Sequence, residues 1–148
     1  YGEMILETRL QQWHGHQVGF GLLFCDIDHF KQINDSLGHQ VGDRVLKMVA
    51  DTLSLTTRTV DCVVRWGGEE FVAILPAVEE AELALIAERL RLMTTAAWLD
   101  LGGEFVRATV SIGATLIGQA DDLASLVARA DSLMYAAKQA GRNQVRLG

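Results

Sequence analysis

Two pairs of acidic residues stand where strands are expected to end or begin. Asp26 and Asp28 follow a short apolar run, and Glu69 and Glu70 follow a glycine pair. Alternate residues of a strand point to the same side, so Asp26 and Asp28 are predicted to share a face. If their strand neighbours the one that carries the glutamates, the carboxylates converge and require a divalent cation such as magnesium or manganese. The alternative is that these acids solubilise strand ends, which is the commoner situation for an isolated Asp-x-Asp.

Glycines and basic residues add the elements of a phosphate site. Gly67-Gly68 precede the glutamates, and the lack of side chains lets backbone amides approach a phosphate. Lys138 and Arg142 flank Gly141 at a predicted helix end, where two cations could hold a triphosphate. A plain hairpin explains the glycines equally well, and basic residues in a last helical turn commonly complement the helix dipole.

Two further polar pairs are ambiguous on their own. An amide and a carboxylate, Asn34 and Asp43, match the donor and acceptor pattern of guanine. Asn34 is also an ordinary cap or turn residue, and Asp43 suits the first turn of a helix. Arg58 and Asp61 form an Arg-x-x-Asp segment, which in isolation is far more often a surface ion pair than a site.

The elements that position these residues are predicted from the spacing of apolar side chains. Helices are predicted at 1–13, within 28–40 with an end near Gly38, at 41–53, at 79–97 and from Asp121 or Asp122 to Gly141. Strands are predicted at 18–25, 62–66, 70–75, 105–117 and 144–147. This order predicts an α+β fold with a central, mostly antiparallel sheet of about five strands and helices packed on it.

Three local details follow from the same patterns. The glycine pair predicts a tight primed turn between the second and third strands, because both residues tolerate a positive φ. Strict alternation over 105–117 predicts one strand with a single buried face. The helix at 79–97 is predicted to bury Leu83, Ile86, Leu90 and Met93.

Length and composition restrict the class of protein. The 148 residues suit a single domain over 1–148, and 49% hydrophobic residues with one proline argue against disorder. The net charge of −6 disfavours binding along a nucleic-acid backbone. Cys25 and Cys62 lack metal-ligand spacing, so we expect two core cysteines in a reducing, cytoplasmic compartment. No apolar stretch approaches the ~20 residues of a membrane span.

Taken together, four segments strongly resemble the GGDEF family of diguanylate cyclases. They read DIDHFKQIND at 26–35, GHQVGD at 38–43, GGEEF at 67–71 and KQAGRN at 138–143. The resemblance implies the palm-like fold of nucleotidyl cyclases and the condensation of two GTP into cyclic di-GMP and two pyrophosphates across a homodimer interface. The chain begins after the turn that usually opens the family, so we expect a trimmed piece of a longer protein, with any sensor or regulatory domain N-terminal to it.

The resemblance also implies the role of individual residues. Asp26, the Ile27 carbonyl and Glu69 would bind two Mg²⁺ or Mn²⁺ ions per half-site. Glu70 would be a further metal-proximal carboxylate that helps to deprotonate the attacking ribose 3′-hydroxyl. Phosphates would be held by Phe30, Lys31, Gly68, Lys138 and Arg142, and guanine by Asn34 and Asp43. A product-inhibition site would comprise Arg58, Asp61 and, with a weaker match, Arg89.

Three rival functions differ in what they require of the sequence. A domain that senses cyclic di-GMP without making it usually lacks the GGEEF signature, whose five residues are all present here. A GTP-binding regulatory domain would act on an attached partner, and only the longer protein could show one. A cyclase that uses ATP is disfavoured by Asp43, because adenine has no N1–H to donate to a carboxylate.

Overall fold

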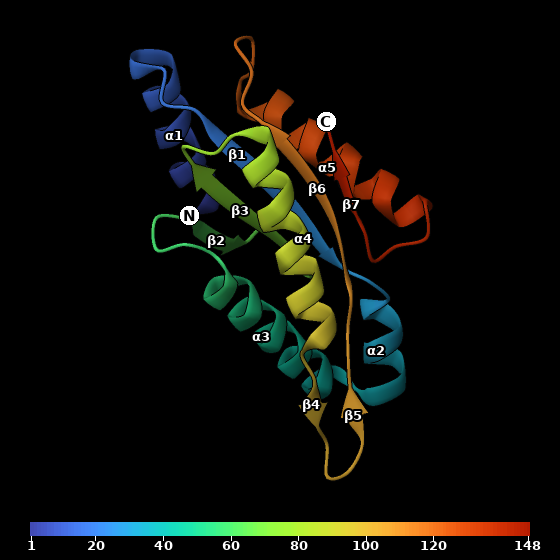
Figure 1. Cartoon of the computed structure of the whole chain (residues 1–148). Coiled ribbons are helices and arrows are strands. Elements are labelled where there is room, and N and C mark those ends of the chain that lie inside the picture. The colour runs from blue at the N-terminus through green and yellow to red at the C-terminus, as the bar shows by residue number, and fades with distance from the viewer.

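The computed structural model describes residues 1–148 and has a five-stranded sheet at its centre, in the spatial order β2-β3-β1-β6-β7 (Figure 1). The strands are β1 (Phe20–Ile27), β2 (Cys62–Arg65), β3 (Glu70–Pro76), β6 (Val110–Leu116) and β7 (Val145–Leu147). All neighbours pair antiparallel except β7, which runs parallel to β6. The predicted α+β class and mostly antiparallel sheet are confirmed.

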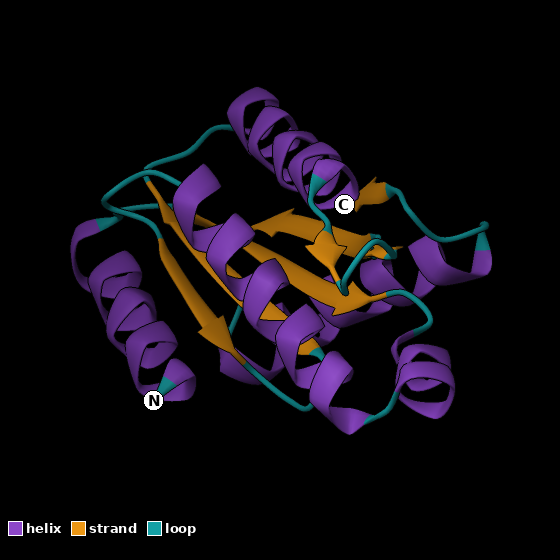
Figure 2. Cartoon of the chain, turned by 90° about the horizontal axis from the view of Figure 1, so that it is seen from below, coloured by secondary structure: helices purple, strands orange, loops and turns teal.

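Five helices cover both faces of the sheet (Figure 2). They are α1 (Gly2–His16), α2 (Phe30–Leu37), α3 (His39–Thr56), α4 (Glu80–Ala96) and α5 (Leu123–Gln139). The apolar run in β1 is continuous because it is buried on both sides. Its odd-numbered residues share a core with α3 and α4, and its even-numbered residues share one with α1 and α5. None of the helices combines the length and apolar character needed to cross a membrane.

The segment 105–117 differs from the single half-buried strand predicted for it. It divides into β5 (Phe105–Val106), which pairs with β4 (Leu99–Asp100) in a projecting hairpin, and β6 (Figure 1). Strand β6 is buried on both faces, including Ser111 and Thr115. The Ser111 hydroxyl bonds to Asp28, and the Thr115 hydroxyl bonds to an arginine of α5, so these polar residues can be buried. Their polar character is why the sequence pattern predicts an exposed face here.

The prediction for the inner face of α4 is wrong at one position. Met93 is 51% exposed, whereas Thr94 is fully buried. The Thr94 hydroxyl donates a hydrogen bond to the Leu90 carbonyl one turn earlier. This local bond satisfies the polar group, so threonine can take the buried position.

The prediction of a primed turn between β2 and β3 is also wrong. Neither Gly67 nor Gly68 has a positive φ, and the amides of Trp66 and Gly67 both donate to the Glu70 carbonyl. A Cβ at position 67 would lie 2.6 Å from a carboxylate oxygen of Glu70, so a larger residue there would push the Glu70 carboxylate aside. Position 68 is open.

The two cysteines differ in burial. Cys25 lies in the core, where burial and the neighbouring Asp26 charge raise its pKa to about 12. Cys62 is only partly buried, at the start of an outer strand, and packs against the edge of the core shared by α1 and α5.

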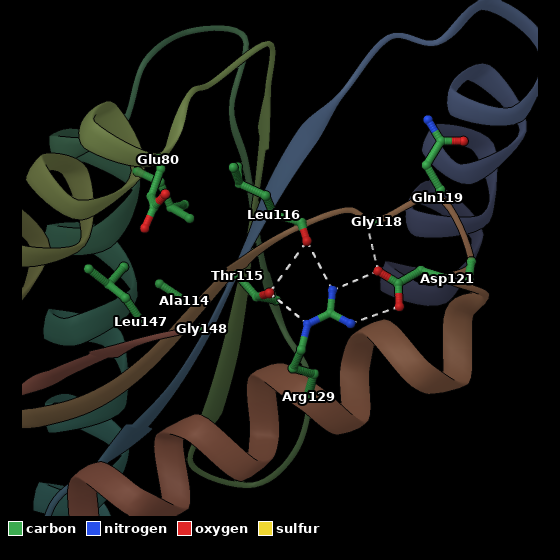
Figure 3. A pocket seen from close by; sticks show the side chains of 12 residues that line it. Glu80, Ala114, Thr115, Leu116, Gly118, Gln119, Asp121, Arg129, Leu147 and Gly148 are labelled. Atoms are coloured by element: carbon green, nitrogen blue, oxygen red, sulfur yellow. Dashed lines mark hydrogen bonds and ion pairs between the residues drawn. The ribbon is translucent and has the colours of Figure 1, made fainter.

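An arginine fastens the connection between β6 and α5 (Figure 3). Arg129 donates to the Thr115 hydroxyl, the Leu116 carbonyl and both carboxylate oxygens of Asp121, at 2.6 to 2.9 Å. These groups form one wall of a cavity of about 570 Å³ that also reaches β7 and α4. The guanidinium holds the pKa of Asp121 at about 2, below its usual value of 3.8.

Replacing Asp121 with asparagine is therefore expected to lower the free energy of unfolding by about 2 kcal/mol at pH 7. Because the folded-state pKa is depressed, the stabilisation is complete above the unfolded value of 3.8 and is lost as pH falls towards 2. Urea unfolding at a series of pH values measures the difference. Asp122→Asn, which keeps an N-cap acceptor, is the control. A deficit in Asp121→Asn that does not change with pH would contradict the ion-pair explanation.

Candidate active site

The carboxylates converge at one end of the sheet, where β1 meets β3. Asp26 and Glu70 are direct cross-strand partners, and the Ile27 amide donates to the Glu69 carbonyl at 3.2 Å. Asp26 continues the even-numbered side of β1, so it faces α5. The structure thus brings together Asp26, Glu69 and Glu70, which the sequence placed on separate segments.

Burial and mutual repulsion disfavour the ionised forms of the three carboxyl groups in this cluster. Desolvation is the largest cause that raises the pKa of Asp26, Glu69 and Glu70, and the Asp26 charge raises the last two further. Asp26 is only 7% exposed, and its buried Oδ1 accepts no hydrogen bond of good geometry. Raised carboxyl pKa values at a strand end are the pattern expected of a site that binds a cation.

The ammonium of Lys138 supplies part of the positive charge that balances these carboxylates. Its Nζ lies 2.7 Å from Asp26 Oδ1 and 3.4 Å from Asp28 Oδ1, and it donates to the Ile27 carbonyl at 3.5 Å. The Lys138 ammonium is therefore held by the Asp26 and Ile27 oxygens, the two groups that the family resemblance assigns to metal binding. These are hard donors that suit Mg²⁺ or Mn²⁺.

The candidate metal ligands do not surround a single metal position in this structure. No three aspartate, glutamate, histidine or cysteine side chains are arranged as they would be around a metal ion. The residues fit a divalent cation by donor type and charge. Because the Lys138 ammonium lies 2.7 Å from Asp26 Oδ1, binding a divalent cation at this carboxylate requires Lys138 to give up that contact.

Asp28 is a buried acceptor rather than an open ligand. It is 2% exposed and accepts hydrogen bonds from Thr109 Oγ1, Ser111 Oγ and the Asn143 amide at 2.6, 2.7 and 3.0 Å. Its contact with Lys138 supports the predicted shared face with Asp26. Sequence reasoning assigns no role to these partners: Thr109 directly precedes β6, Ser111 lies within it, and neither belongs to a motif.

The candidate phosphate-binding groups lie around the carboxylates. Helix α2 begins with Phe30 and Lys31 directly after β1, and no side chain caps its N-terminus. A free helix N-terminus presents backbone amides to an anion. The Phe30 ring is buried, whereas Gly68 is open. Arg142 lies on an exposed turn whose next amide, that of Asn143, is bonded to Asp28.

A second arginine fixes the glycine turn, and the sequence did not single it out. Arg65 donates through Nε to the Gly67 carbonyl at 3.1 Å and through Nη2 to the Gly68 carbonyl at 2.6 Å. These bonds orient the segment that precedes the two glutamates. The only sequence signal is an arginine two residues before the glycine pair.

The two candidate guanine contacts lie at the junction of α2 and α3. A Cβ on Gly42 would stand 1.8 Å from Asn34 Oδ1, so Asn34 packs directly over this glycine. Asp43 is the next residue, and it lines a cavity of about 430 Å³ together with Lys47 and Arg65. Glycine at position 42 is therefore a steric requirement for the position of Asn34.

The Arg-x-x-Asp segment forms a close ion pair. Arg58 Nη2 lies 2.7 Å from Asp61 Oδ1, and the Asp61 side chain is fully buried. Arg58 also binds Glu82 of α4 at 3.1 Å, a partner that the sequence did not indicate. A cavity of about 310 Å³ is lined by Arg58 and Asp61. Arg89 donates to the Thr56 carbonyl at 3.0 Å, near the same end of α3.

The sequence that carries this site matches a known protein family over nearly its whole length. The model of the family described as diguanylate cyclase, GGDEF domain, matches residues 2–144. The chain is a member of the GGDEF family.

Relatives and solved structures agree with this assignment. The GGDEF chain is 42% identical over 126 residues to the response regulator PleD of Caulobacter vibrioides, covering 83% of this chain and 28% of PleD. It is 40% identical over 146 residues to the diguanylate cyclase DgcP of Pseudomonas aeruginosa, covering 96% of this chain and 22% of DgcP. It therefore spans about a quarter of the length of these relatives.

The fold is shared just as closely. The crystal structure of the GGDEF domain of DgcB from Caulobacter crescentus in complex with c-di-GMP superposes with a TM-score of 0.93 at 31% identity. The match covers 98% of this chain and 86% of that one. The palm-like architecture expected from the resemblance is thus that of the GGDEF cyclase domains.

Proposed function

We propose that this GGDEF domain is one half of a diguanylate cyclase, which condenses two GTP into cyclic di-GMP and two pyrophosphates. The observation that carries the proposal is the cluster of Asp26, Glu69 and Glu70 around the Lys138 ammonium. This cluster provides carboxylates for a divalent cation and a basic group for phosphate at one end of the sheet. Close relatives named diguanylate cyclases support the same reaction.

Asp26, the Ile27 carbonyl and Glu69 would hold two Mg²⁺ or Mn²⁺ ions in each half-site. When bound, such ions polarise the α-phosphate and favour ionisation of the 3′-hydroxyl. Lys138, released from Asp26, moves to the triphosphate, where Arg142, Lys31 and the first amides of α2 share the negative charge.

Glu70 accepts the proton in this scheme. Its carboxylate stands on the strand position paired with Asp26, so it can accept the proton of a hydroxyl held at this end of the sheet. The 3′-oxygen of one GTP forms a bond to the α-phosphorus of the other, the bond to pyrophosphate breaks, and the hydroxyl proton passes to Glu70. A second step of the same kind closes the ring: the 3′-oxygen of the other nucleotide attacks the remaining α-phosphorus, and the second pyrophosphate leaves.

Each chain holds one GTP, so the two nucleotides must face each other across a two-fold axis. Asn34 and Asp43 select guanine by pairing with its edge. Activity then depends on protein concentration or on a dimerising module. We further propose that the product inhibits the enzyme by binding Arg58, Asp61 and Arg89, in competition with Glu82 for the Arg58 guanidinium.

Turnover by the purified chain tests the proposal. With GTP and Mg²⁺ we expect cyclic di-GMP by chromatography, with two pyrophosphates released for each product molecule. ATP in place of GTP, or removal of the metal with a chelator, is expected to abolish product formation. Tight binding of cyclic di-GMP by a chain that neither binds nor consumes GTP would identify a receptor instead.

Replacing Gly42 with alanine is expected to raise the KM for GTP roughly tenfold with little change in kcat. The new Cβ occupies the place of the Asn34 amide and displaces a group that binds the base in both the ground and transition states. Steady-state kinetics measure the effect, and Gly15→Ala is the control, because a Cβ there meets nothing within 4 Å. An unchanged KM would remove Asn34 from the guanine site.

A further inference from the structure

The turn that follows α5 has an unusual backbone. Gly141, Arg142 and Asn143 have φ values of 119°, 65° and 47°, so three successive residues lie in the left-handed region. Glycine adopts this region readily, whereas other L-residues do so at an energetic cost. A run of this kind persists only when surrounding groups hold it in place.

Asn143 is held from two sides. Its backbone amide donates to Asp28 at 3.0 Å, and its side-chain Oδ1 accepts from Arg91 Nη1 at 2.8 Å and, at the longer distance of 3.4 Å, from Thr95 Oγ1 of the same helix. Asp28 directly follows β1, whereas Arg91 belongs to α4. The Arg91 guanidinium is itself oriented by Glu88, whose carboxylate accepts from its Nε at 2.9 Å, and the Arg91 side chain is only 16% exposed.

We propose that Asp28 and Arg91 are positioning residues that act through Asn143 and aim Arg142 at the nucleotide phosphates, an inference that rests on the proposed function. Arg142 immediately precedes Asn143, so the bonds to Asn143 fix the backbone from which the Arg142 side chain extends. Asp28 also contacts Lys138. The same buried carboxylate therefore sets the position of both cations of the KQAGRN segment.

Arg91 permits the cleaner test, because it touches none of the catalytic carboxylates. The Arg91 side chain donates hydrogen bonds only to Glu88 and Asn143. Removing it should disturb the turn while leaving Asp26, Glu69 and Glu70 in place. A merely structural residue would lower stability without a selective effect on substrate binding.

The first experiment measures steady-state kinetics of Arg91→Ala, Arg142→Ala and the double variant. We expect Arg91→Ala to raise the KM for GTP roughly tenfold with kcat within about twofold. In the Arg142→Ala background the same change should add less than about twofold, because Arg91 acts through Arg142. Arg91→Lys retains a donor for Asn143 and is expected to restore part of the loss. Leu92→Ala, on the exposed side of the same helix, is the control.

The second experiment does not depend on catalysis. Amide hydrogen exchange in the nucleotide-free protein is expected to be at least about tenfold faster at Asn143 in Arg91→Ala than in the parent or in Leu92→Ala. Unchanged exchange, or additive effects of Arg91→Ala and Arg142→Ala on KM, would overturn the positioning role. A parent chain that exchanges as expected but does not use GTP would overturn the proposed function while leaving the bonds that hold the turn established.

Discussion

Replacing Glu70 with glutamine is expected to lower the rate of cyclic di-GMP formation roughly 1,000-fold without loss of the fold. Glutamine has nearly the same volume as glutamate but cannot accept the proton of the 3′-hydroxyl, and it removes a negative charge beside Asp26. The cross-strand pairing of residue 70 with Asp26 is made by the backbone and is retained. Initial rates of product formation with saturating GTP and Mg²⁺ measure the effect.

The same variant has a second expected property. The raised pKa of Glu70 means that its ionised form is disfavoured in the folded, metal-free protein. The sign follows from linkage: the destabilisation is absent at low pH and develops as pH rises through the unfolded value of 4.5. Glu70→Gln should therefore melt at a higher temperature than the parent at pH 7, with no difference well below pH 4.5. The exposed Glu104→Gln is the control for both properties, and turnover at the parent rate would refute the role given to Glu70.

Replacing Arg58 with alanine is expected to raise the concentration of cyclic di-GMP needed for half-inhibition roughly 100-fold. The Arg58 guanidinium can donate two parallel charge-assisted bonds to one guanine edge, and alanine keeps neither donor. Its loss should leave the uninhibited rate unchanged, because the site lies on the α3–α4 side of the domain, away from the carboxylates. Inhibition curves with added product measure the shift.

Arg58→Ala needs a companion variant, because it leaves the buried Asp61 carboxylate without its cation. That loss is expected to destabilise the domain by about 1–3 kcal/mol. The double replacement of Arg58 and Asp61 by alanine removes the unpaired charge and should show the same relief of inhibition. Arg9→Ala, an arginine on α1, is the matched control. Inhibition equal to that of the parent in both variants would exclude product binding at this site.

Much of the fold can be predicted from the pattern of apolar residues within each helix or strand taken by itself. The helices are predicted close to their observed bounds, because burial of one face imposes a helical period on their apolar residues. The strand before Asp26 is predicted from a continuous apolar run, because it is buried on both faces. The convergence of Asp26 with Glu70 was conditional on strand neighbours. It is fixed by the pairing of β1 with β3, which no local pattern records.

The errors arise where a polar residue is satisfied by a distant partner. Ser111 and Thr115 read as exposed positions, but Asp28 and Arg129 make them buried ones. The same cause hid the role of Asn143, whose partners lie 115 and 52 residues away in the chain. Spacing within a motif predicts which residues belong to a site, whereas the groups that hold them come from elsewhere in the fold.

If two chains each supply half of one reaction, mixing active and inactive chains should change the product. Parent chain is combined with a large excess of Glu70→Gln at a concentration where the specific rate of the parent has reached its plateau. Mixed dimers retain one competent Glu70, so we expect them to form one phosphodiester bond and to accumulate the linear dinucleotide while cyclic di-GMP formation falls. Cyclic product formed at the full parent rate, with no linear intermediate, would show that each chain completes the reaction alone and would contradict the account.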